Sequence, residues 1–204
     1  MSKILCLYYS RSGNTRMVME KIAELLNAEL VEITDGKKRS GFIGFLTSGF
    51  DATKKTPEQL ESFHAEQPLN TYDHVILGTP VWAGRCCSIM KSFLISHGKE
   101  LPEKVSYVIT HMGVNDYEQI YAQMNQYLNQ PHTIGLSLQP KADDYHQKIY
   151  DFMRTIAAMH EEVIEEEDAE EPQENTKKEG KNGSASRPKQ KRRGKKHARK
   201  AKRH

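Results

Sequence analysis

The hexapeptide Ser10-Arg11-Ser12-Gly13-Asn14-Thr15 joins a predicted strand to a predicted helix. Residues 3–9 form an apolar run typical of a strand, and residues 15–27 carry apolar side chains at helical spacing. The first backbone N–H groups of a helix have no partner within the helix, and the helix dipole favours an anion beside them. Hydroxyl and amide side chains add donors, and glycine permits close approach. The hexapeptide therefore predicts a phosphate cradle.

Two patterns missing from the sequence narrow the ligand of this cradle. No Walker lysine follows the glycine, and no G-x-G-x-x-G is present. The pattern therefore points away from triphosphates and dinucleotides and towards a single terminal phosphate. An ordinary capped turn before a helix uses the same residue types and is the alternative for this stretch taken alone.

The rest of the chain alternates predicted strands and helices, as a parallel α/β sheet requires. Most of the strands are near-continuous apolar runs, which suit strands buried on both faces. The predicted strands cover residues 3–9, 29–33, 74–78, 105–111 and 133–138, and the predicted helices cover residues 15–27, 56–64, 88–97, 117–129 and 143–162.

The first strand and the cradle together resemble the flavodoxin family. Its pattern is an apolar strand, an aromatic, a hydroxyl residue and, five positions later, a threonine; here Leu7-Tyr8-Tyr9-Ser10 leads to Thr15. The resemblance covers residues 3–160. It implies an α/β fold of the flavodoxin-like doubly wound type, short-chain form, with a five-stranded parallel sheet in the order 2-1-3-4-5 and FMN as cofactor.

The loop after the third predicted strand resembles the flavin-ring loop of flavodoxins and related quinone reductases. It reads Gly78-Thr79-Pro80-Val81-Trp82-Ala83-Gly84. The resemblance implies that Trp82 stacks on the isoalloxazine ring and that Thr79 and Pro80 line the ribityl chain. A tryptophan that belongs only to the core is the alternative.

The loop after the fourth predicted strand has a glycine followed four residues later by an aromatic, Gly113 and Tyr117. The resemblance implies that Tyr117 covers the other face of the ring, with Asn115 or backbone groups at the pyrimidine edge. The alternative is that Tyr117 simply begins a helix. The cofactor-binding residues implied in all are Ser10, Arg11, Ser12, Gly13, Asn14, Thr15, Thr79, Pro80, Val81, Trp82, Ala83, Gly84, Met112, Gly113, Val114, Asn115 and Tyr117.

The net charge of +3 over 204 residues conceals three different regions. Residues 1–160 carry −1 and have the length of one domain, residues 161–172 carry −8 and form an acidic helix end or linker, and residues 173–204 carry +12. This last region is nearly free of apolar residues, so we expect it to be disordered. Its basic run over residues 177–204 predicts binding to a polyanion, whether RNA, DNA or an anionic membrane. A solvated tail without a partner is the alternative.

Other features of the sequence indicate a cytoplasmic protein. No apolar run approaches the roughly 18 residues of a membrane span, no signal-peptide pattern is present, and three cysteines do not make a disulfide framework. Cys86 and Cys87 are either redox-active thiols near the flavin or packing residues. No metal site is predicted. The aromatic, glycine-rich residues 41–50 are expected to cover the flavin edge, form a homodimer contact or join the core.

These patterns support three functional hypotheses. The first is a flavodoxin-like redox protein that transfers electrons through non-covalently bound FMN to redox partner proteins or a small quinone-type acceptor. The second is an NAD(P)H-dependent quinone or FMN reductase of the same fold. The third is a cofactor-free, nucleic-acid-associated protein that acts through the basic tail. No catalytic residue is assigned.

Overall fold

Five parallel strands form the centre of the molecule. The computed structural model describes residues 2–37 and 59–169 of the chain. The strands are β1 (Ile4–Tyr8), β2 (Glu29–Glu32), β3 (His74–Trp82), β5 (Val105–Thr110) and β6 (Gly135–Leu138). They lie in the order β2-β1-β3-β5-β6, and a short strand β4 (Arg85–Cys86) pairs antiparallel with the end of β3. With β4 set aside, this is the predicted 2-1-3-4-5 order, and the flavodoxin-like fold class is confirmed.

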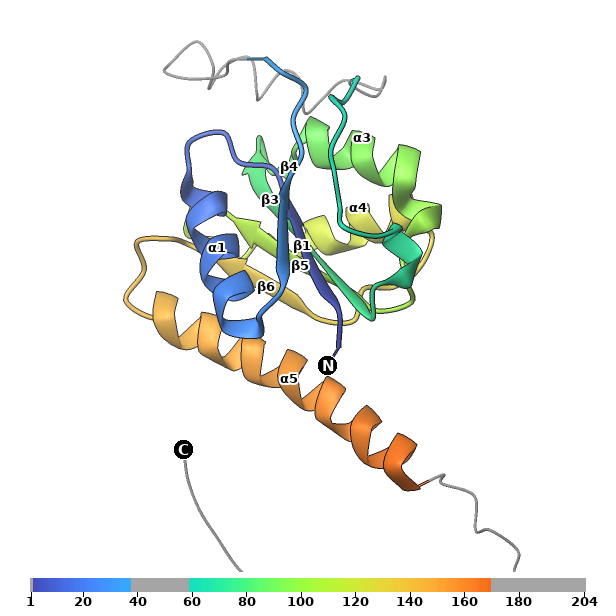
Figure 1. Ribbon diagram of the computed structural model, residues 1–204. Helices are drawn as coiled ribbons and strands as arrows, with labels where there is room; N and C mark the ends of the chain where they lie inside the picture. The colour runs from blue at the N-terminus through green and yellow to red at the C-terminus, as the bar shows by residue number, and fades with distance from the viewer. Residues whose placement is uncertain (1, 38–58, 170–204) are drawn as a thin grey trace, which may run out of the picture. The chain divides into compact units, whose positions relative to one another are not determined.

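Helices cover both faces of this sheet (Figure 1). They are α1 (Asn14–Leu26), α3 (Ser88–His97), α4 (Gln119–Leu128) and α5 (Tyr145–Ala169), with single 3₁₀ turns η1 (Leu69–Thr71) and η2 (Gly98–Glu100). Helices α1 and α5 pack on one face, and α3 and α4 on the other. In the described residues, no helix combines the length and the hydropathy that a membrane span needs.

The side chains of β1 show why its sequence is an unbroken apolar run. Leu5 and Leu7 belong to the core beneath α3 and α4, whereas Cys6 and Tyr8 belong to the core beneath α1 and α5. Successive side chains of a strand point to opposite faces of the sheet, so a strand covered on both sides needs apolar residues at every position. Two separate hydrophobic cores result, one on each side of the sheet.

Two helices end at an asparagine in the left-handed conformation. Asn27 after α1 has φ 48° and Asn129 after α4 has φ 61°, and each donates its backbone N–H to a carbonyl of the last turn. Asparagine adopts this conformation more readily than other residues with a Cβ, and it therefore stops the helix at a defined place.

Several predicted elements differ from the structure in their bounds or in kind. Strand β3 does not end at residue 78 but continues to Trp82, which pairs with Arg85 across a two-residue turn formed by Ala83 (φ 48°) and Gly84 (φ 71°). Such a turn matches the twist of a hairpin, so the segment predicted as a loop is extended. Residues 59–64 of the predicted helix 56–64 are not helical.

The remaining differences concern the ends of the domain. Helix α5 begins at Tyr145 and continues to Ala169, beyond the predicted end at residue 162. The predictions for residues 41–50, for the start of helix 56–64 and for the basic region 173–204 lie outside the described residues.

Candidate functional site

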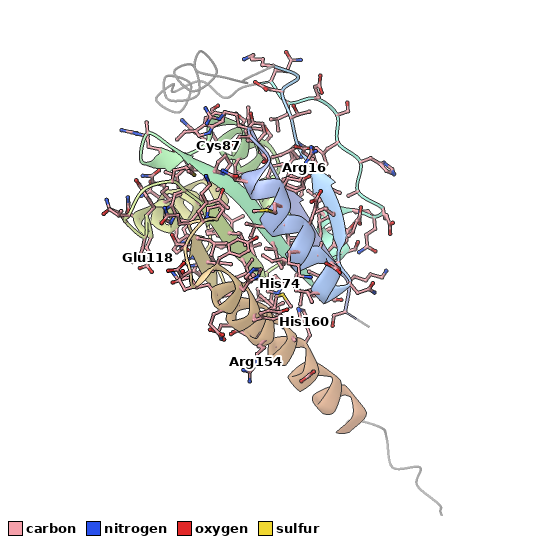
Figure 2. All side chains as sticks on the ribbon, turned by 90° about the vertical axis from the view of Figure 1, so that its left-hand side faces the viewer. Arg16, His74, Cys87, Glu118, Arg154 and His160 are labelled. Atoms are coloured by element: carbon pink, nitrogen blue, oxygen red, sulfur yellow. The ribbon has the colours of Figure 1, made fainter. Side chains whose placement is uncertain are left out.

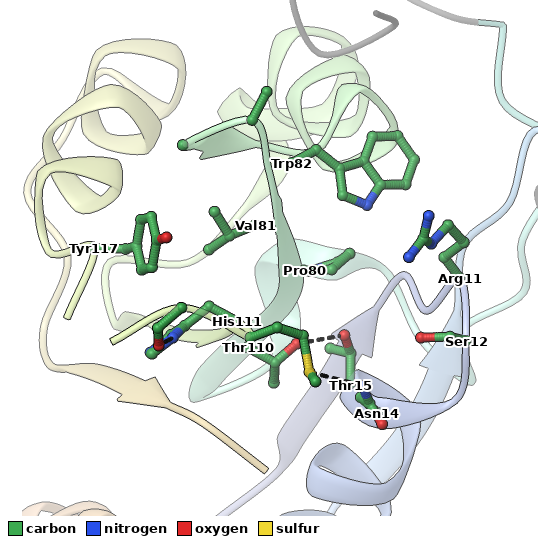
Figure 3. A pocket seen from close by; sticks show the side chains of 14 residues that line it. Arg11, Ser12, Asn14, Thr15, Pro80, Val81, Trp82, Thr110, His111 and Tyr117 are labelled. Carbon is green, nitrogen blue, oxygen red and sulfur yellow. Dashed lines mark hydrogen bonds between the residues drawn. The ribbon is translucent and has the colours of Figure 1, made fainter. Parts of the chain in front are cut away.

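A pocket of about 360 Å³ opens at the carboxyl ends of β1, β3 and β5 (Figure 3). In a doubly wound sheet this is the edge beside the switch in strand order, where ligands bind. Its walls come from the loop before α1, the hairpin between β3 and β4, and the loop between β5 and α4. The lining residues are Arg11, Ser12, Asn14, Thr15, Pro80, Val81, Trp82, Ala83, Gly84, Thr110, His111, Met112, Gly113 and Tyr117.

The first wall is the N-terminus of α1. Its N-cap is Gly13 (φ 89°), which provides no side-chain hydrogen bond to the first turn, and the first turn contains no acidic residue. A helix start of this kind leaves its N–H groups and the positive end of its dipole for an external anion. The Oγ of Ser10 accepts a hydrogen bond of 3.1 Å from the Gly13 N–H and closes the preceding turn.

A buried hydrogen bond fixes this helix start to the centre of the sheet. The Oγ1 atoms of Thr15 on α1 and Thr110 at the end of β5 lie 2.8 Å apart. Both threonines line the pocket, and both are almost completely buried. This bond therefore fixes the N-terminus of α1, where the sequence predicts a phosphate cradle, against the carboxyl end of β5.

The second wall contains the single tryptophan of the chain. Trp82 is only 5% exposed and meets the ring of Tyr9 edge-on, with ring centroids 5.5 Å apart. It also lines the pocket, on the same side as Arg11 (Figure 3). The sequence offers a core role and a ligand-facing role for Trp82 as alternatives. In the structure the same side chain packs in the core and also lines the pocket.

The third wall is folded tightly around Gly113. Tyr117 has φ 54° and precedes α4 rather than beginning it, and its ring centroid lies 4.9 Å from that of His111, with the two rings tilted by 51°. A Cβ atom on residue 113 would lie 2.3 Å from the Tyr117 hydroxyl, so any other residue there would force the Tyr117 side chain to move. The His111 Nδ1 lies 2.9 Å from the Gly113 carbonyl oxygen and, as a donor, orients the imidazole in the pocket wall.

The charges of the pocket are few. Among the lining residues that the structure describes, Arg11 alone is permanently charged; Arg85 is exposed on β4 and does not line the pocket. Burial lowers the pKa of His111, an effect that its contact with the Gly113 carbonyl and the charge of Asp116 partly offset. The site therefore combines one cation, neutral donors and apolar walls.

The structure brings together most of the residues that the sequence singles out. Five of them do not line the pocket: Ser10, Gly13, Thr79, Val114 and Asn115. The buried Thr79 Oγ1 donates to the Cys87 Sγ over 3.2 Å, and Val114 is 96% exposed. Thr110 and His111 also line the pocket, although they are not among the residues predicted to bind the cofactor. Their position at the carboxyl end of a predicted strand is the sequence feature that could have indicated them.

The adjacent cysteines Cys86 and Cys87 lie in surroundings typical of cysteines that pack in a protein core. Cys86 and Cys87 are buried thiols, and burial, together with the neighbouring thiol, raises the pKa of Cys86 well above its usual value. The Cys87 Sγ accepts a hydrogen bond from the Met90 N–H and so caps α3. Reactive cysteines have the opposite character, a lowered pKa and access to solvent. Among the described residues, no group of three or more His, Cys, Asp or Glu side chains is placed to hold a metal ion.

Comparison with known proteins identifies the fold independently. A model of the flavodoxin domain matches residues 51–162, more than half of the chain. A flavoprotein of Lactobacillus acidophilus, solved in complex with FMN, superposes with a TM-score of 0.52 at 25% identity and covers 66% of this chain and 92% of its own. A candidate flavoprotein of Bacteroides eggerthii has a TM-score of 0.62 at 23% identity over 77% of this chain and 99% of its own, which shows a shared fold.

A sequence relative carries an enzyme name. The NAD(P)H dehydrogenase (quinone) of Archaeoglobus fulgidus is 28% identical over 133 residues, which is 54% of this chain. The match covers 61% of the relative's length. From the domain match, the strand order and the pocket at the switch point, the chain belongs to the flavodoxin family.

Proposed function

We propose that this protein binds FMN without a covalent bond and uses it in oxidation–reduction. The observation that carries the proposal is the N-terminus of α1, without a side-chain cap, opening into a pocket with apolar and aromatic walls. FMN has the matching parts, a terminal phosphate and a flat ring system. The flavoprotein of L. acidophilus, which binds FMN, supports the proposal at the level of the family.

The donors present fit the phosphate. Ser12, Asn14 and Thr15 offer hydroxyl and amide groups beside the free N–H groups of α1, and Arg11 adds one positive charge. Among the described residues that line the pocket, none is a carboxylate that would repel an anion. Because the hydrogen bond between the Thr15 and Thr110 hydroxyls already orders the cradle, little further ordering is needed when the phosphate binds.

The opposite part of the pocket fits the ring. Trp82 and Tyr117 would hold the isoalloxazine, while Pro80 and Val81 exclude water from it. Bound FMN supplies the electron-transfer and hydride chemistry, and the protein tunes it. When the His111 Nδ1 donates its proton to the Gly113 carbonyl, the other ring nitrogen, Nε2, is the atom that can accept a proton in this wall.

Arg11 adjusts the electrostatics of the bound cofactor. A cation in a pocket with apolar walls stabilises negative charge gained on reduction, so it raises the reduction potential. Neutral donors alone would leave the phosphate charge uncompensated and would have the reverse effect. Arg85, the cation that the sequence places next to Trp82, lies outside the lining, and Arg11 takes this role instead.

A reductase is the second candidate, favoured by the quinone dehydrogenase of A. fulgidus. It shares the pocket and the cofactor with the first, and differs in taking a hydride directly from NAD(P)H. Oxidation of NADPH by the purified, FMN-loaded protein in the presence of a soluble quinone supports the reductase. Electron uptake only from another redox protein supports the carrier.

The test of FMN binding compares FMN with riboflavin, which lacks the phosphate. Fluorescence titration of the flavin-free protein is expected to give much tighter binding of FMN. Replacing Ser12 and Thr15 together by alanine should weaken FMN far more than riboflavin, because only FMN uses the cradle. Equal losses for both ligands would remove the phosphate from the N-terminus of α1, and no flavin uptake at micromolar concentration would refute the proposal.

A further inference from the structure

Met112 lies at the mouth of the pocket and is the most exposed methionine of the part of the chain that the structure describes. Its side chain is 62% exposed, against 47% for Met17, whereas Met19, Met90 and Met124 are completely buried. It follows His111 in the loop between β5 and α4 and lines the pocket. Oxidants in solution therefore reach this thioether before the others.

The sulfur of Met112 bridges two walls of the pocket. It accepts a hydrogen bond from the Nδ2 of Asn14 over 3.8 Å, across 98 positions of the sequence (Figure 3). Asn14 is the first residue of α1, and both side chains line the pocket. A thioether is a weak acceptor, so this contact holds the two walls together only loosely.

Oxidation changes the chemistry of this contact. Hydrogen peroxide converts the thioether into a sulfoxide: the sulfur gives up two electrons, an S–O bond forms, the O–O bond breaks, and the second oxygen leaves as water. The sulfoxide is polar, and its oxygen is a much stronger acceptor than the sulfur. With the sulfur 3.8 Å from Nδ2, this oxygen is within reach of the Asn14 side-chain amide.

We propose that Met112 is a redox-sensitive modification site, at which peroxide oxidation closes the pocket against phosphate-bearing ligands. The sulfoxide oxygen occupies the Asn14 amide, one of the donors offered to the cofactor phosphate, and it tightens the bridge between the two walls. The effect on FMN rests on the proposed function, whereas the preferential oxidation of Met112 does not. Methionine sulfoxide reductases reverse the modification, so the site is a switch rather than a lesion.

The experiment uses the full chain, freed of flavin and treated with limiting hydrogen peroxide. Peptide mass spectrometry follows the oxidation of each methionine, and fluorescence titration gives the FMN affinity of each sample before and after treatment. Met112→Leu removes the oxidisable sulfur at the pocket. Met17→Leu is the matched control, because it removes an exposed sulfur that does not line the pocket.

Met112 is expected to oxidise faster than Met17. Oxidised wild-type protein and oxidised Met17→Leu should each bind FMN about three- to tenfold more weakly than before treatment, the factor that one net hydrogen bond is worth. Met112→Leu should keep its own starting affinity, and reductase treatment should restore that of the wild type.

Two outcomes would overturn the proposal: slower oxidation of Met112 than of Met17, or equal losses of affinity in wild type and Met112→Leu. Failure of untreated protein to bind FMN would instead refute the proposed function. In that case the order of oxidation still decides whether Met112 is the sensitive site.

Discussion

Two histidines buried at the edge of the sheet opposite the pocket predict a specific loss of stability in acid. His74 begins β3 and is completely buried; its Nε2 lies 2.8 Å from the Ser106 Oγ and its Nδ1 lies 3.3 Å from the Nε2 of His160 on α5 (Figure 2). Burial, together with the nearby His160 and Lys104, lowers the pKa of His74 from 6.5 to about 3. The pKa of His160 is also lowered, by burial and by Lys104, against the opposing charge of Asp73.

The direction of the effect follows from which state binds the proton first. Because the pKa of His74 is lower in the folded protein, the unfolded chain takes up the proton as the pH falls below 6.5, and stability is lost from there towards pH 3. Above pH 6.5 the full stability is present. Between pH 7 and pH 5 the lost free energy of unfolding from His74 alone is about 2 kcal/mol, at about 1.4 kcal/mol per pH unit.

Urea unfolding of the flavin-free protein, followed by circular dichroism at pH 8, 7, 6 and 5, measures this loss. His74→Gln is expected to be less stable at pH 8, since it loses the shape and contacts of the imidazole. Its stability should nevertheless fall by about 2 kcal/mol less than that of the wild type between pH 7 and pH 5. His146→Gln, which changes an exposed histidine of α5, should keep the wild-type slope. An unchanged slope in His74→Gln would refute the reasoning.

Three further predictions concern the pocket and the tail. Trp82→Ala should weaken FMN binding by about 1–3 kcal/mol in a fluorescence titration, because an aromatic wall of the pocket is lost; unchanged affinity would restrict Trp82 to the core. Arg11→Gln should lower the two-electron reduction potential of bound FMN by about 30 mV, equivalent to about 1.4 kcal/mol of lost charge stabilisation. The same change at Arg85 is the control, and an equal shift in both variants would contradict the assignment to Arg11. Deleting residues 173–204 should abolish a salt-sensitive affinity for RNA, measured by filter binding, and leave FMN binding intact; RNA binding that survives the deletion would locate the nucleic-acid surface elsewhere.

The resemblance to the flavodoxin family, which rests on local motifs of the sequence, implied the order of the strands and the place of the pocket. Apolar runs such as residues 105–111 are typical of strands buried on both faces, and their alternation with helices favours a parallel α/β sheet. In such a sheet the switch point follows from the strand order, so the loops beginning at Ser10, Gly78 and Gly113 had to meet at one edge. The free N–H groups of α1 are equally a local property, since they depend only on where a helix begins.

Other features depended on contacts between residues far apart in the sequence. Thr15 meets Thr110 across 95 positions, and His74 meets His160 across 86. The continuation of β3 to Trp82 depends on pairing with β4, and the position of Tyr117 depends on its packing against His111 and Gly113. Periodicity in a sequence records whether a side chain is buried, because burial repeats with the helix or strand. It does not record which partner is met, because the partner is set by the register in which distant elements pack, and only the tertiary structure decides that.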